Sequence, residues 1–220
     1  MKDIAIEFSH VCFSYEGAAS YALEDVSFVA RPGQALALTG PNGSGKSTAL
    51  RLVVGLDHPS QGQVSVNGQE VSKRTMADRA FAKRLRQRVG LVFQDPETQL
   101  FCPTVTDEIA FGPRQMGLAD DEVMRRVEDC LALFDLTGLR ARAPWQLSGG
   151  EKRRLAIACV VSLGPEVLLL DEPTNDLDER GYLRVTRFLD SFVSAGKCVV
   201  VSTHDRRLVS DLHAREVALA

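Results

Sequence analysis

Residues 40–47 read Gly40-Pro41-Asn42-Gly43-Ser44-Gly45-Lys46-Ser47, and the short apolar run 34–39 leads directly into them. The three glycines can adopt φ values that other residues avoid, and they leave the backbone N–H groups open to a ligand. A helix expected over 46–55 would point its positively polarised N-terminus at the same space. This pattern predicts a polyphosphate site, with Lys46 at the β- and γ-phosphates and the Ser47 hydroxyl on Mg²⁺; a chance Gly-rich turn is the alternative.

The bulk composition is that of one globular domain. The chain has 220 residues, of which 45% are hydrophobic and 25% charged, and its net charge of −3 gives no reason to expect a nucleic-acid partner. Five scattered cysteines without a C-x-x-C pair indicate a reducing compartment. No signal peptide is recognisable, and no apolar run approaches the ~20 residues of a membrane-spanning helix. We therefore expect any membrane component to be a separate polypeptide.

Apolar strands alternate with helices along most of the chain. Strands are expected at Ile4–Phe8 and at 26–28, 34–39, 64–66, 89–93, 167–170 and 198–202. Helices are expected at 46–55, 76–88, 120–134, 151–163, 183–193 and 206–212. The alternation predicts an α/β fold with a mostly parallel sheet covered on both faces. We interpret residues 1–220 as one domain: a nucleotide-binding core at about 1–94 and 164–220, including an N-terminal antiparallel β subdomain, and an inserted α-helical lobe at about 95–163.

Two carboxylates, Asp171 and Glu172, end the apolar run 167–170. Open parallel sheets bind ligands at the carboxyl ends of their strands, so Asp171 would reach the phosphate pocket. We assign Asp171 to Mg²⁺, through water, because Mg²⁺ keeps several waters in proteins. Glu172 points elsewhere and is a candidate general base for the attacking water. The alternative, a pair of solvated carboxylates, is disfavoured by the phosphate loop upstream.

A third motif, Leu147-Ser148-Gly149-Gly150-Glu151, lies between these two. Its glycines open a helix whose N-terminus can face an anion, and Ser148 adds a hydroxyl donor. A single phosphate site has no use for such a motif. The phosphate loop, this motif and the carboxylate pair, in this order, resemble the ATP-binding cassette ATPases, most of which power membrane transporters. The resemblance runs from Tyr15 to His204.

The resemblance implies a head-to-tail dimer with two ATP molecules between its subunits. In that family the Ser-Gly-Gly motif of one subunit binds the γ-phosphate held by the other. A homodimer and a heterodimer with a second cassette ATPase are both compatible with the sequence. In that family a further segment crosses the interface, and here it reads Asn175-Asp176-Leu177-Asp178 in place of the commoner Ser-Ala-Leu-Asp. This departure leaves open how the two ATP sites communicate.

The resemblance also implies roles for single residues. Gln94, at the end of the strand 89–93, would ligate Mg²⁺ or orient water, His204 would sense the γ-phosphate, and Tyr15 would stack on adenine. An ordinary edge aromatic is the alternative for Tyr15. The expected catalytic residues are Glu172, His204, Gln94 and Lys46. The expected ATP-binding residues are Tyr15, Gly40, Pro41, Asn42, Gly43, Ser44, Gly45, Lys46, Ser47, Thr48, Ser148, Gly149 and Gly150. The expected Mg²⁺ ligands are Ser47, Gln94 and Asp171.

Two further segments make the resemblance strongest to one group within the family. Residues 94–101 (QDPETQLF) and 104–113 (TVTDEIAFGP) are similar to the ATPases of energy-coupling-factor importers, which carry vitamins, cobalt and nickel. The short C-terminal end is similar to the metal- and biotin-type members. This implies a Mg²⁺-dependent ATPase at the cytoplasmic face of the membrane, with integral membrane subunits as partners. We expect Pro96–Phe101 to line a groove for a partner helix, with Leu100 and Phe101 exposed; packing of the lobe onto the sheet is the alternative.

Other functions fit the sequence less well. Chromosome and repair clamps need a long coiled coil between the phosphate loop and the Ser-Gly-Gly motif, and this chain has no room for one. Translation cassettes carry two such domains in one polypeptide. A catalytically dead scaffold is disfavoured because Lys46, Asp171, Glu172 and His204 are all present. ATPases of lipoprotein release and of cell division share every catalytic motif and stay open as alternatives.

Overall fold

The central sheet is buried on both faces. In the computed structural model, which describes residues 5–18 and 20–220, every residue of β7 (Val167–Asp171) and of β8 (Cys198–Ser202) is buried. Alternate side chains enter two different apolar cores, with Leu168 and Leu170 on one face and Leu169 on the other. Double-sided burial is characteristic of parallel sheets.

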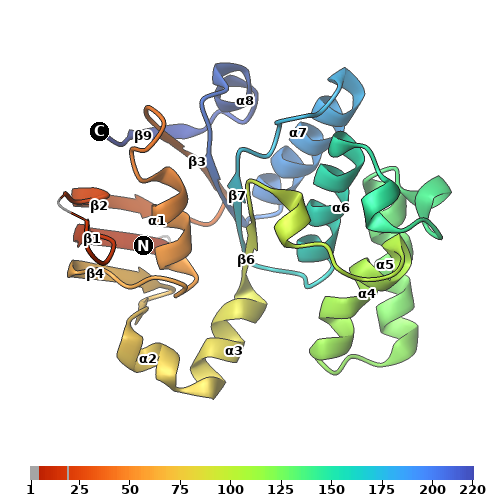
Figure 1. Cartoon of the computed structure of the whole chain (residues 1–220), viewed down its shortest axis with the longest axis horizontal. Helices are drawn as coiled ribbons and strands as arrows, with labels where there is room; N and C mark the ends of the chain where they lie inside the picture. Colours follow the sequence, from red (N-terminus) through yellow and green to blue (C-terminus); the bar gives the residue numbers. More distant parts are fainter. Residues whose placement is uncertain (1–4, 19) are drawn as a thin grey trace.

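The sheet has the order β6-β7-β8-β3-β9, and all of its pairings are parallel (Figure 1). Three of these strands are β6 (Val89–Val92), β3 (Gln34–Thr39) and β9 (Arg215–Ala218). The expected parallel sheet is confirmed. Strand β9 was not predicted, because this short edge strand is mostly exposed and begins with two charged residues.

A second sheet is antiparallel, with the order β2-β1-β4-β5. Its strands are β1 (Ile6–Phe13), β2 (Leu23–Ala30), β4 (Gln61–Val66) and β5 (Gln69–Glu70). Asn67 and Gly68 form the turn between β4 and β5 with φ values of 49° and 73°, as expected for an Asn-Gly hairpin. The expected N-terminal antiparallel β subdomain is confirmed; Ile4 lies outside the described residues.

Helices cover the two faces of the parallel sheet unequally. On one face, α1 (Lys46–Val53) packs with the antiparallel sheet in a single core. The other face is covered by α4 (Val105–Gln115), α5 (Asp120–Leu133), α6 (Gly149–Val161) and α7 (Glu179–Ser194), and α8 (Arg206–Asp211) connects β8 to β9. Figure 1 shows the antiparallel sheet and the helices α4–α6 on opposite sides of the parallel sheet.

The helices of the expected lobe are not packed separately from the sheet. Ile109 of α4 and Val123 of α5 belong to the same buried cluster as Leu168 of β7. A short 3₁₀ turn, η1 (Pro96–Thr98), lies between β6 and α4, and two more, η2 (Thr137–Leu139) and η3 (Pro144–Gln146), lie between α5 and α6. One continuous core therefore connects the lobe helices to β7, which ends at Asp171, and to β6, which precedes Gln94.

The expected single helix over 76–88 is wrong. The structure has α2 (Lys73–Ala77) and α3 (Arg79–Arg88), separated by Asp78 with φ −73° and ψ 109°. The Asp78 carboxylate accepts a hydrogen bond from the Ala80 N–H at 2.8 Å and so caps α3. An aspartate that can cap a new helix competes with continuation of the old one.

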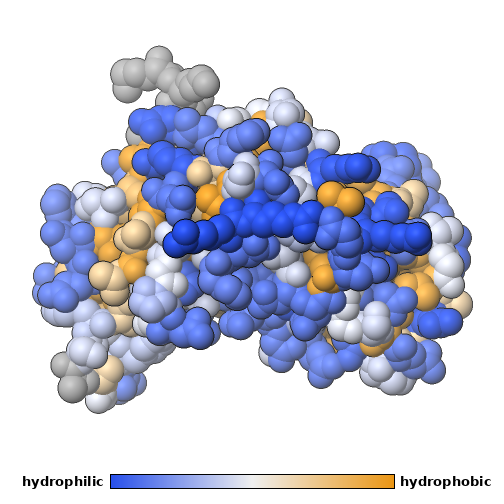
Figure 2. Space-filling model, turned by 90° about the horizontal axis from the view of Figure 1, so that it is seen from above, coloured by the Kyte–Doolittle hydropathy of each residue, from blue (hydrophilic) through white to orange (hydrophobic). Residues whose placement is uncertain are grey.

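The expected exposure of Leu100 is also wrong, because Leu100 is partly buried and packs against the core that contains the lobe helices. Phe101 is 65% exposed and makes an edge-on contact with Phe111 of α4. On the face seen in Figure 2 the surface is mostly hydrophilic, and its apolar residues form small patches toward the two ends. Within 5–18 and 20–220, no helix combines the length and apolar character needed to cross a bilayer.

Candidate active site

The loop between β3 and α1 depends on its glycines. Gly40, Gly43 and Gly45 have φ values of 144°, 86° and 84°, which favour glycine strongly. A Cβ on Gly45 would lie 2.2 Å from the carbonyl oxygen of Ala22, whereas no atom is within 4 Å of the corresponding position on Gly43. The backbone at Gly45 therefore packs tightly against the residues that begin β2, whereas the space beside Gly43 is open to a ligand.

Two polar side chains mark this loop as an anion site. The Lys46 ammonium donates hydrogen bonds to the carbonyl oxygens of Gly40 and Pro41, both at 2.9 Å, and thus lies over the loop. The Ser44 hydroxyl is buried and has no hydrogen-bond partner among the described residues. An unpaired buried hydroxyl is unfavourable unless a ligand completes it. A phosphate oxygen held by the loop would supply the missing acceptor.

A cavity of about 390 Å³ opens beside the loop and collects most of the predicted site residues. It is lined by Tyr15, Ala22, Asn42, Gly43, Gly45, Lys46, Ser47, Thr48, Gln94, Asp171 and Glu172. The Tyr15 hydroxyl is hydrogen-bonded to Thr48 Oγ1 at 2.8 Å, and its ring packs edge-on against Phe13. These contacts hold the ring at the entrance of the cavity, where one face can accept a base.

Asp171 is fixed by a partner that the sequence reasoning missed. Its carboxylate accepts a hydrogen bond from the Ser202 hydroxyl, and the two residues are register partners in the parallel pair β7–β8. Both side chains are buried, with exposures of 6% and 0%. The signal was present in the sequence, because a hydroxyl residue also ends the strand 198–202. The hydrogen bond leaves one carboxylate oxygen for the cavity.

Glu172 has an unusual backbone and two side-chain partners. Its φ is 47°, in the left-handed region, and its N–H donates to the Ser202 carbonyl oxygen at 2.9 Å. Thr203 Oγ1 donates to Glu172 Oε2 at 3.2 Å, and His204 Nδ1 lies 2.8 Å from Oε1. Thr203 was also missed by the sequence reasoning. These contacts fix a buried carboxylate in the lining of the cavity.

The expected Mg²⁺ ligands lie close to one another. Ser47, Gln94 and Asp171 line the 390 Å³ cavity and also a second cavity of about 220 Å³ beside it. A hydroxyl, an amide and a carboxylate together offer the hard oxygen donors that Mg²⁺ prefers. The residues present therefore fit a Mg²⁺ ion that accompanies a bound triphosphate.

The Ser-Gly-Gly motif is located elsewhere. Of the described residues that line the cavity, none is Ser148, Gly149 or Gly150. Ser148 caps α6: its hydroxyl accepts from the Glu151 N–H at 3.4 Å and donates to the Glu151 carboxylate at 2.9 Å. The exposed start of α6 is thus separate from the cavity of the same chain, and its free N–H groups could bind an anion there.

Comparisons with known proteins agree with this geometry. The family model described as ABC transporter matches residues 23–175. The nickel import ATP-binding protein LarO of Lactiplantibacillus plantarum is 42% identical over 96% of this chain and 86% of its own length. The energy-coupling factor transporter ATP-binding protein EcfA1 of Methanospirillum hungatei is 41% identical over 94% of this chain and 73% of its own length.

A solved structure also matches nearly the whole chain. The dimeric, post-hydrolysis structure of the ATP-binding cassette MJ0796 bound to ADP and Pi has a TM-score of 0.87 at 29% identity and covers 97% of this chain and 94% of that chain. A glycine loop, a carboxylate pair and a Ser-Gly-Gly helix on this fold define an ATP-binding cassette ATPase. The chain belongs to the ABC transporter family.

Proposed function

We propose that this protein is the ATP-hydrolysing subunit of an importer of the energy-coupling-factor type, whose cargo is a transition metal ion or a vitamin. The observation that carries the proposal is the segment from Gln94 to Phe101. It runs from the nucleotide cavity directly to an exposed aromatic residue on the helical side, the side of the parallel sheet that α4–α7 cover. The similarity to LarO and EcfA1 over nearly the whole chain supports this assignment.

The hydrolytic chemistry rests on positioning and on charge neutralisation. The glycine loop and Lys46 hold the β- and γ-phosphates, and Tyr15 holds the base. Bound Mg²⁺, held by Ser47, Gln94 and Asp171, would neutralise charge that develops on the phosphates. Glu172 accepts the proton of the attacking water, and Thr203 and His204 keep its carboxylate in place.

The site is completed by a second cassette subunit. Ser148, Gly149 and Gly150 would bind the γ-phosphate held by that subunit, because they do not line the cavity of their own chain. The dimeric state of MJ0796 supports such a pair. Hydrolysis would remove the γ-phosphate that the two subunits share and allow them to separate.

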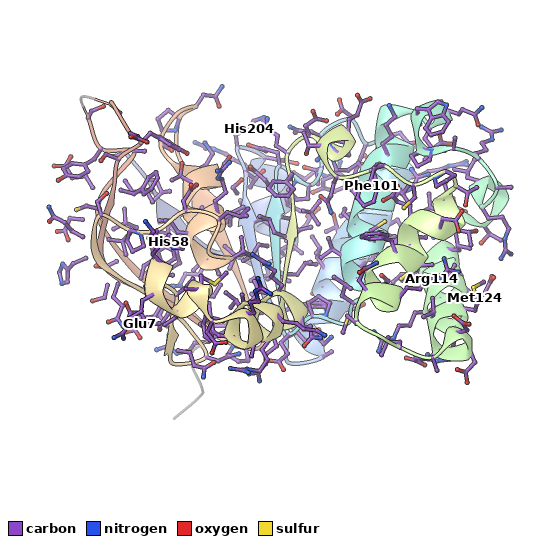
Figure 3. The ribbon with its side chains drawn as sticks, turned by 60° about the horizontal axis from the view of Figure 1, so that its bottom comes forward. Glu7, His58, Phe101, Arg114, Met124 and His204 are labelled. Carbon is purple, nitrogen blue, oxygen red and sulfur yellow. The ribbon has the colours of Figure 1, made fainter. Side chains whose placement is uncertain are left out.

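A partner helix would bind on the helical side. Phe101 and Phe111 form an exposed aromatic pair there, and Figure 3 places Phe101 on the same side as Arg114 and Met124. Gln115, one turn after Phe111 on α4, lines a groove of about 580 Å³ between α3 and α4. We call the Phe101–Phe111 pair and this groove the docking face.

The composition of the docking face suits an amphipathic helix. Met76, Met116 and Leu163 contribute apolar side chains to the lining of the groove, and unbranched methionines adapt to different partners. A helix of an integral membrane subunit that binds here would place this chain at the inner face of the membrane.

Affinity purification of the tagged chain from native membranes tests the proposal. We expect an integral membrane subunit to co-purify with the wild type and to be lost with a Phe101→Gln, Phe111→Gln double variant. Uptake of radioactive Ni²⁺, Co²⁺ and a panel of vitamins by cells with and without the gene then identifies the cargo. Co-purification with an exporter or with cell-division proteins, and unchanged uptake of every cargo, would contradict the importer assignment.

A further inference from the structure

The largest of the fully buried side chains belongs to a cation, Arg153, on the second turn of α6. Only 2% of it is exposed. Arginine is seldom buried without a partner, because moving its charge out of water is strongly unfavourable. The contacts of this side chain should therefore explain why it is there.

One contact of Arg153 is at the start of the segment that carries Gln94. Its Nη1 donates a hydrogen bond to the carbonyl oxygen of Phe93 at 3.1 Å. Phe93 follows β6 and immediately precedes Gln94, which lines the nucleotide cavity. A shift of Gln94 relative to α6 therefore changes this hydrogen bond.

A second contact of Arg153 is with the segment that follows the catalytic carboxylates. Its Nη2 lies 3.9 Å from Oδ2 of Asp176. Asp176 has φ 63°, and its backbone carbonyl is so close to Gly150 that a Cβ there would lie 2.9 Å from it. Asp176 thus touches the Ser-Gly-Gly motif on one side and Arg153 on the other.

The charge and hydrogen bonding of Arg153 are incompletely satisfied. Its Nε has no hydrogen-bond partner among the described residues. Burial lowers the pKa of the guanidinium, and the carboxylates of Asp176, Asp171, Asp95 and Glu172 act in the opposite direction. One buried cation therefore keeps an unused donor beside the carboxylate of Asp176, which lies 3.9 Å from its Nη2.

We propose that Arg153 is a positioning residue that couples the two ATP sites of the cassette dimer. This inference rests on the proposed dimer, in which Gln94 serves the site of its own chain and Ser148–Gly150 serve the site of the partner. The Arg153 guanidinium contacts both Phe93, the residue before Gln94, and Asp176, which lies against Gly150 of the Ser-Gly-Gly motif. Occupation of one site therefore changes the geometry of the other, and hydrolysis depends cooperatively on ATP.

The test compares Arg153→Met and Arg153→Lys with Arg154→Met. Arg154 is the matched control, because it lies on the same helix and also donates to a backbone carbonyl, that of Phe134, at 3.0 Å within the helical side. For each full-length variant, in the purified cassette dimer, we would measure the melting temperature, the ATP affinity of the dilute monomer, kcat and the Hill coefficient for ATP.

We expect both Arg153 variants to bind ATP as monomers within about twofold of the wild type, while kcat falls about tenfold and the Hill coefficient falls to one. Lysine keeps the charge and should keep the melting temperature, but a single ammonium does not span Phe93 and Asp176. Arg154→Met should keep the Hill coefficient of the wild type. The lysine variant decides the question if Arg153→Met does not fold.

Three results would overturn the inference: wild-type cooperativity in Arg153→Lys, equal loss of cooperativity in Arg154→Met, or a wild-type dimer that hydrolyses ATP without cooperativity. A wild-type dimer that hydrolyses no ATP at all would instead contradict the proposed function. Combining Arg153→Lys with Asp176→Asn adds a double-mutant cycle, in which additive effects on kcat would also count against coupling.

Discussion

The imidazole Nδ1 of His204 lies 2.8 Å from a carboxylate oxygen of Glu172 within the same chain. The histidine side chain is 67% exposed, while that of the glutamate is only 8% exposed; Figure 3 shows His204 at the surface. The proposed γ-phosphate sensor and the proposed general base therefore share one contact. A movement of the exposed ring toward a phosphate would release the buried carboxylate.

Glu172→Gln should bind ATP but hydrolyse it at least about a hundredfold more slowly, because the amide cannot accept the proton of the attacking water. The ATP that persists should hold the dimer closed. Gel filtration with ATP should then give a dimer that ADP does not support, while Glu166→Gln, a surface change, should behave as the wild type. Near-normal turnover in Glu172→Gln would remove this residue from the role of base.

Ser148→Arg should abolish hydrolysis and leave ATP binding by the dilute monomer within about twofold, because a bulky cation at the start of α6 obstructs the subunit interface and not the cavity of its own chain. Equilibrium binding of a fluorescent ATP analogue below the dimerisation concentration measures this. A monomer that loses ATP affinity would show that the motif acts in its own site.

The cap of α6 should make the stability of the folded protein depend on pH. The Ser148 backbone N–H, hydrogen-bonded at 2.7 Å, lowers the pKa of the Glu151 carboxyl below its ordinary value of 4.5. A lowered folded-state pKa means that the stabilisation is present above pH 4.5 and is lost as the pH falls through the folded value. Glu151→Gln should therefore lose melting temperature near neutral pH and show a shallower acid decline than the wild type. Parallel melting curves over the acid range would exclude this contribution.

Gly45→Ala should abolish ATP binding, because the new Cβ would lie 2.2 Å from the Ala22 carbonyl oxygen in a residue with φ 84°. Strain of this kind is worth about 1–3 kcal/mol, enough to lower the melting temperature by several degrees. Gly138→Ala is the control, since nothing lies within 4 Å of its Cβ position. An alanine variant at position 45 that binds ATP normally would contradict the described loop geometry.

Phe101→Gln should weaken binding of the membrane partner about tenfold while leaving the melting temperature of the isolated chain unchanged. Phe101 is preferable to the neighbouring Gln99, whose side-chain oxygen accepts a hydrogen bond from the Phe93 N–H at 3.2 Å, and to Leu100, which packs in the core. Leu133→Gln, at an exposed apolar residue of α5, is the control. Equal loss of partner binding in both variants would indicate that the partner binds exposed apolar surface in general and not the docking face.

The sequence predicted those features that local chemistry determines. Apolar runs of four to six residues predicted the central strands. The spacing of Gly40, Gly43 and Gly45, which the structure shows at positive φ, predicted the phosphate loop. Ser202, Thr203 and Arg153 were missed because their importance arises from contacts between distant segments: Arg153 and Phe93 are 60 residues apart. The break at Asp78 was missed because hydrophobic periodicity continues through it, whereas its side chain caps a new helix.

The left-handed backbone at Glu172 has a consequence for protein engineering. A residue with a side chain at φ 47° is less stable there than glycine by about 1 kcal/mol. A selection for thermal stability alone would therefore favour glycine at position 172 and would enrich chains that still bind ATP but lack the proposed base. Stabilised libraries of this cassette should be screened for turnover in parallel, because improved melting at this position signals loss of function.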